Sequence, residues 1–199
     1  IISYVVLLGG LVLGILAVSR SRPELVLDAY SKARERLVLG LPLGSVLLIA
    51  LNLGFYLVAQ RGFYHPSTPL DMPFYSWSYT NLVGIFTSPI AHAGPSHLIG
   101  NTTAALVFLP AAEYIVGHKT GRRPLARIVG FAAVGYGVGV FVTVFSWGPT
   151  VGFSGALLAF VGFVVVTHPV RGVALLVLNE IVGVLLSALR SPVVVSSGG

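Results

Sequence analysis

Six apolar stretches, each close to the length of a membrane-spanning helix, occupy most of this 199-residue chain. They lie at about 1–19, 41–59, 97–116, 128–148, 151–169 and 172–190. A helix that crosses the roughly 30 Å hydrocarbon core needs about 20 such residues, because its backbone N–H and C=O groups must be satisfied within the segment. The composition agrees, with 55% hydrophobic and only 9% charged residues. The sequence therefore predicts an all-α polytopic membrane bundle and argues against a soluble domain around one core.

The basic residues are concentrated in the loops on one side of this predicted bundle. Ten of the twelve Lys and Arg residues fall on that side, and only Arg61 and Arg190 fall on the other. Basic residues in short loops are retained in the cytoplasm, so the first stretch runs inward and loop 60–96 lies outside. The net charge of +6 fits a surface beside anionic lipid and requires no nucleic acid. We therefore expect a multi-pass protein of the cell membrane, with the lipid bilayer as a partner.

Two connecting segments carry further information. Loop 60–96 contains five prolines, which argue against a long helix, and many aromatic residues, which suit the membrane interface. Segment 20–39 mixes apolar and charged residues, which leaves two interpretations open. It forms either a short amphipathic helix at the inner surface or a solvated linker.

The polar residues near the outer ends of two predicted spans share one depth. His97 and Asn101 are four residues apart and so lie on one helix face, and Ser154 opens the fifth span. Small residues that let another helix approach closely follow Ser154, at Gly155, Ala159 and Gly162. Polar groups within a membrane are candidates for function, and a hydroxyl beside side-chain donors has the parts of an acyl-transfer site. Each residue alone also has a structural interpretation, so their common depth is what favours a site.

The motifs around these residues resemble those of the rhomboid intramembrane serine proteases. The family signature GxSGxxxAxxG is matched by Gly152, Ser154, Gly155, Ala159 and Gly162, and HxxxN is matched by His97 and Asn101. The approach to HxxxN, FTxxxxHxxxxH, is matched by Phe86, Thr87, His92 and His97, and Glu113 stands in the place of a family glutamate. The resemblance covers about 41–190. It divides the chain into an extra N-terminal transmembrane helix with a basic cytoplasmic loop over 1–40, and a rhomboid-like core over 41–199 that holds helices one to five of six.

This resemblance implies a serine endopeptidase, a hydrolase that cleaves transmembrane segments of other membrane proteins near the outer leaflet. In such a site Ser154 is the nucleophile, and its backbone N–H holds the oxyanion together with the His97 and Asn101 side chains. His92 is then a loop-stabilising residue. The implied partners are transmembrane protein substrates. We expect no cofactor and no metal ligands, and the chain has no cysteine to form a disulfide.

The chain departs from the family pattern in two respects. Val83 and Gly84 replace a tryptophan-arginine pair of the first outer loop, which bears on substrate preference. More importantly, the family's base is a histidine on the sixth core helix, which we expect beyond Gly199. His168 cannot replace it, because it lies about 21 Å from Ser154 along one helix. This chain alone is therefore expected to cleave poorly or not at all, and to expose the helix face against which the sixth helix packs.

Other classes of protein stay open as alternatives. The main one is a catalytically inactive rhomboid-like protein that binds transmembrane segments. A transporter is less favoured, because only Asn179 and Glu180 lie at mid-membrane depth, where hydrogen bonds to neighbouring helices explain them. A soluble-type lipase is disfavoured because "GFSGA" lacks the second glycine of GxSxG.

Overall fold

The computed structural model describes residues 17, 20–65, 72–117, 123–146 and 149–190, so nearly all of the expected first span lies outside the described residues. The described part is helical, with its segments joined by turns and two isolated β-bridges, and the predicted all-α bundle is confirmed. In chain order the elements are α2 (Pro23–Arg36), α3 (Leu43–Gly54), the π-helical turn η1 (Phe55–Ala59), the 3₁₀ turn η2 (Met72–Phe74), α4 (Leu82–Thr87), α5 (Pro95–Gly117), α6 (Pro124–Val144), α7 (Ser154–Thr167) and α8 (Pro169–Arg190).

Three of the described helices, α5, α6 and α8, are long and apolar enough to cross a membrane. The combined helix α3–η1 and α7 are apolar but shorter. Helix α7 covers less than the predicted 151–169 for two reasons. Gly152 has φ 110°, which interrupts the helix at its start, and Pro169 disfavours helical backbone at the residue before it.

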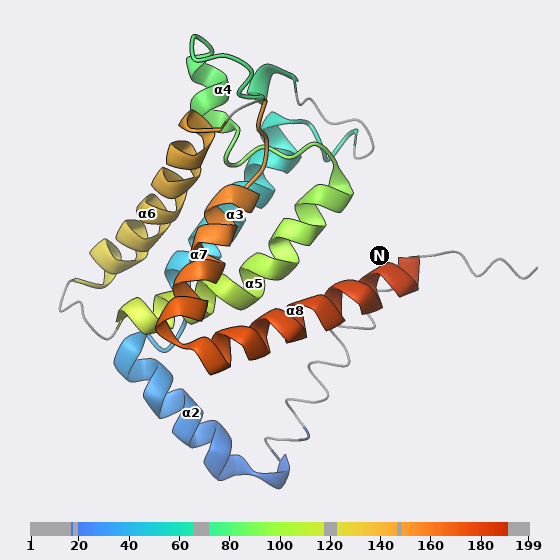
Figure 1. Cartoon of the computed structure of the whole chain (residues 1–199). Coiled ribbons are helices and arrows are strands. Elements are labelled where there is room, and N and C mark those ends of the chain that lie inside the picture. The colour runs from blue at the N-terminus through green and yellow to red at the C-terminus, as the bar shows by residue number, and fades with distance from the viewer. Residues whose placement is uncertain (1–16, 18–19, 66–71, 118–122, 147–148, 191–199) are drawn as a thin grey trace, which may run out of the picture.

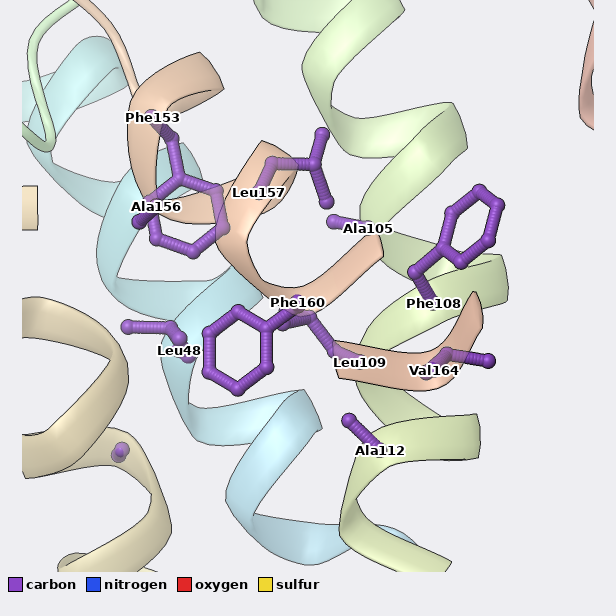
Figure 2. Packing of buried hydrophobic residues seen from close by; sticks show 11 residues of the cluster. Leu48, Ala105, Phe108, Leu109, Ala112, Phe153, Ala156, Leu157, Phe160 and Val164 are labelled. Carbon is purple, nitrogen blue, oxygen red and sulfur yellow. The ribbon is translucent and has the colours of Figure 1, made fainter. Parts of the chain in front are cut away.

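Helix α7 lies at the centre of the bundle, among α3, α5 and α6 (Figure 1). Its apolar side chains meet those of α3 and α5 in one buried cluster, where Phe160 lies beside Leu48 (Figure 2). Helix α6 closes the other side, with the Phe131 and Phe160 ring centroids 5.4 Å apart. Because lipid is as apolar as these side chains, the stabilisation comes from close packing rather than from removal of water. This packing holds α7 within the bundle.

The two ends of the bundle differ in charge. Helix α2, the end of α5, the start of α6 and the α7–α8 connection lie at one end, and α4 lies at the other (Figure 1). At the basic end, Arg127 donates to the carbonyls of Arg36 and Gly117, and the Arg36 guanidinium lies 4.7 Å from the centre of the Tyr114 ring. Segment 20–39 is thus largely helical and joined to the core at its end, as the first of its two interpretations requires. Which side of the membrane this basic end faces stays a prediction.

Glu113 joins the basic end of α5 to the start of α3. Its carboxylate is 7% exposed and accepts hydrogen bonds from the backbone N–H groups of Gly44 and Ser45, at 3.0 and 2.7 Å, and from the Ser45 hydroxyl at 2.7 Å. The first N–H groups of a helix have no partner within the helix, and the helix dipole favours an anion there. Glu113 therefore caps α3 from another helix.

Candidate functional site

Ser154 stands at the first position of α7, after a turn that only glycine fits well. The turn is held by Gly152, whose N–H donates to the Ser88 carbonyl at 2.7 Å, and by Thr150, whose backbone pairs with that of Ser76. The φ of 110° at Gly152 lies in the region that L side chains rarely adopt. The turn delivers Ser154 to a helix N-terminus, where unpaired N–H groups and the helix dipole favour negative charge.

His97 and Asn101 lie against this turn from the first two turns of α5. A Cβ atom placed on Gly152 would lie 2.4 Å from His97 Cε1, 2.8 Å from His97 Nε2 and 3.4 Å from Asn101 Nδ2. Gly152 is two residues before Ser154, and two residues of chain span at most about 7 Å. The structure therefore brings the three predicted site residues together at the end of the bundle that holds α4.

His92 packs behind His97. Its side chain is fully buried, and its ring meets the His97 ring edge to face, with centroids 5.3 Å apart. Burial, and to a smaller extent the neighbouring His97, lower the pKa of His92 to about 4. A buried, neutral ring in the loop before α5 fits the expected loop-stabilising residue.

Gln60 holds the His92 backbone and was missed by the sequence reasoning. The Gln60 side-chain amide donates to the His92 carbonyl at 2.8 Å and accepts from the His92 N–H at 2.7 Å. Gln60 is fully buried directly after η1, 32 residues before His92 in the chain. In the sequence, Gln60 is only an uncharged polar residue at the end of an apolar stretch. That pattern does not identify the residue to which its side chain binds.

The small residues of α7 face two different directions. Gly155 lies against α6, because a Cβ on it would be 2.5 Å from Val142 Cγ1. Gly162 has nothing within 4 Å of the equivalent position, and Ala159 beside it is exposed. The two glycines thus do not share a neighbour, because Gly155 meets α6 and none of the described residues lies close to the Gly162 position. An exposed α7 face does exist, formed by Leu158, Ala159, Gly162, Phe163 and Val166.

The other titratable candidates lie away from Ser154. His168 follows the last residue of α7, and Lys32 is on α2 at the same end of the bundle. His65 is exposed in the segment that follows η1. His118 and Lys119 lie outside the described residues.

The polar pair of α8 faces α5. Asn179 and Glu180 line a pocket of about 220 Å³ with Ser96 and Thr103 of α5. Within the described part of the chain, the buried Asn179 Oδ1 has no hydrogen-bond partner. The pair thus faces a neighbouring helix as expected, but this oxygen does not make the expected hydrogen bond.

Comparison with known proteins identifies a family. A family model described as the Rhomboid domain matches residues 79–195, which is more than half of the chain and includes α4 to α8. No curated protein and no solved structure matches. The matched range contains His97, Asn101 and Ser154.

Proposed function

Because this chain belongs to the rhomboid family, we propose that it is an intramembrane serine endopeptidase that cleaves transmembrane segments by acyl transfer through Ser154. The observation that carries this proposal is the close approach of His97 and Asn101 to Gly152, where an added Cβ would lie 2.4 Å from His97 Cε1 and 3.4 Å from Asn101 Nδ2. It puts a hydroxyl at a helix N-terminus and two side-chain donors around one turn of backbone. Such an arrangement suits nucleophilic attack with charge stabilisation.

In the proposed reaction, Ser154 Oγ attacks the scissile carbonyl carbon, and the carbonyl oxygen becomes an oxyanion. The Ser154 backbone N–H, His97 Nε2–H and Asn101 Nδ2–H then donate to that oxygen. Asn101 Nδ2 is buried and has no hydrogen-bond partner among the described residues, so none of these residues competes with the oxyanion for this donor. One such donor typically contributes about 10²–10³ in rate. Collapse of the intermediate expels the amine, which takes up the proton that the general base removed from Ser154, and water, deprotonated by the same base, then attacks the acyl carbon and returns the hydroxyl to Ser154.

The serine proton must pass to a general base, which we propose to lie on a helix packed against the exposed α7 face. Ala159 and Gly162 carry little side chain there, so a helix backbone can approach closely. His168 and Lys32 are at the other end of the bundle and cannot take this role. The membrane concerned is the cell membrane in this proposal, with the site near its outer leaflet.

An inactive relative that binds transmembrane segments is the second candidate, favoured by the distance of His168 from Ser154. The test is to co-express the full-length protein with reporter proteins that carry transmembrane segments, and to detect cleavage by gel shift. Cleavage should disappear in Ser154→Ala and persist in the control Ser31→Ala, an exposed serine of α2. Cleavage that survives Ser154→Ala would reject the nucleophile, and binding of the reporters without any cleavage would support the inactive alternative.

A further inference from the structure

Loop 88–94 touches both halves of the candidate site. From one side, the Ser88 carbonyl accepts the Gly152 N–H at 2.7 Å and so holds the turn before Ser154. From the other side, the His92 ring packs on the His97 ring at 5.3 Å. His97 therefore lies between the His92 ring and the Gly152 backbone. The position of this loop sets the position of the His97 imidazole relative to Ser154.

Loop 88–94 contains little regular secondary structure that could hold it in place. Ala91 N donates to Thr87 and Ser88 within the loop, and the Ser88 hydroxyl lies 3.1 Å from that of Thr143. The His92 backbone is held instead by the Gln60 amide, which fills both its donor and its acceptor. Both residues are fully buried, so water does not compete for these hydrogen bonds. Gln60 follows a π-helical turn, a feature often found near functional sites.

We propose that Gln60 is a positioning residue, whose paired hydrogen bonds to the His92 backbone hold the His97 imidazole in place for oxyanion binding. This inference rests on the proposed function of Ser154 and His97. Gln60 itself touches neither substrate nor the reacting atoms. Its effect passes through His92.

Substitutions at Gln60 separate this role from general stability. Gln60→Met keeps the length of the side chain but can neither donate to nor accept from the His92 backbone. Ser45→Ala is the matched control, because it removes one buried hydrogen bond from the opposite end of α3, at Glu113. In the full-length protein we expect Gln60→Met to slow fluorophosphonate labelling of Ser154 at least tenfold. Ser45→Ala should slow it less than twofold at a similar change in unfolding temperature.

Gln60→Glu adds a pH dependence of labelling that is not expected if Gln60 only stabilises the fold. The carboxylate accepts from the His92 N–H but cannot donate to the carbonyl, whereas the protonated acid can do both. Labelling relative to the natural protein should therefore rise as the pH falls from about 8 to 5.5, a window that contains the raised pKa expected of a buried Glu. The titratable groups packed nearby are Tyr56, His92 and His97, and the pH profile of Gln60→Met, which keeps them without a carboxyl at position 60, gives their own contribution.

A second measurement does not depend on activity. The ¹³Cε1 resonance of His97, assigned with the His97→Gln variant, should shift in Gln60→Met and return toward its natural position in Gln60→Glu at low pH. An unchanged His97 resonance, with labelling lost only in proportion to unfolded protein, would overturn the positioning role. If Ser154 is not labelled in the natural protein, the proposed function fails, and the His97 resonance alone decides whether Gln60 positions that ring.

Discussion

Gly152→Ala tests whether the turn before Ser154 requires a residue without a side chain. The added Cβ would lie 2.4 Å from His97 Cε1 and 2.8 Å from His97 Nε2. Since carbon atoms in contact lie about 3.5–4.0 Å apart, the imidazole or the turn must move by about 1 Å. A displacement of about 1 Å in a catalytic geometry typically costs about 10²-fold in rate, or about 2.7 kcal/mol of transition-state stabilisation.

The backbone adds a second cost at the same position. Alanine at a φ of 110° is strained, by about 1–3 kcal/mol. We therefore expect Gly152→Ala to lower both the unfolding temperature and the rate of Ser154 labelling, with the rate falling by about 10² in protein that remains folded.

The assay measures the second-order rate of fluorophosphonate labelling and thermal unfolding of the full-length protein in detergent. Gly137→Ala is the matched control, because it is an exposed glycine of α6 with nothing within 4 Å of the added Cβ. That variant should label at the natural rate. A Gly152→Ala protein that is folded and labels as fast as the natural protein would refute the contact between the turn and His97.

Three further predictions follow from the same structure. Glu113→Gln replaces a carboxylate that receives three hydrogen bonds at the start of α3, so it should destabilise the fold by about 1.5–3 kcal/mol in thermal unfolding. Ser45→Ala loses one of the three hydrogen bonds and should destabilise the fold less. Equal effects of the two substitutions would contradict a stabilising role for the negative charge of Glu113. The pKa of His92 is lowered to about 4 in the folded protein, below its ordinary value of 6.5, so the unfolded state binds the proton more readily. The free energy of unfolding should therefore be independent of His92 above about pH 6.5 and fall by up to about 3 kcal/mol as the pH drops to 4. A His92→Gln protein whose stability depends on acid pH in the same way would contradict the lowered pKa of His92. Gly162→Trp on the exposed α7 face should abolish labelling of Ser154 in the full-length protein without unfolding the bundle, whereas Gly137→Trp on α6 should label normally. Labelling that is retained in Gly162→Trp would reject that face as the docking site of the helix that carries the base.

The bundle and the candidate site were largely predictable, because both depend on local patterns. Apolar length alone located α5, α6 and α8, since the membrane leaves the backbone few other conformations. His97 and Asn101 share a helix face by their spacing, and alternating topology puts their end of α5 beside the start of α7.

The remaining features depend on contacts between distant segments. Gln60 and His92 are 32 residues apart, and Glu113 and Ser45 are 68 apart, so no periodicity links them. The true start of α7 depends on the positive φ of Gly152 and on the pairing of Thr150 with Ser76, which lies in another loop. The small residues of α7 predicted a helix that approaches closely, and at Gly155 that helix is α6, through Val142. A stripe of small residues predicts close approach without identifying the neighbour.

The most direct measurement is to identify the residue modified by a fluorophosphonate in the full-length, membrane-embedded protein, by mass spectrometry of its peptides. The account predicts a single major adduct on Ser154, formed more slowly after His97→Ala or Asn101→Ala. An adduct on another residue, or a rate that does not change when both His97 and Asn101 are removed, would contradict it.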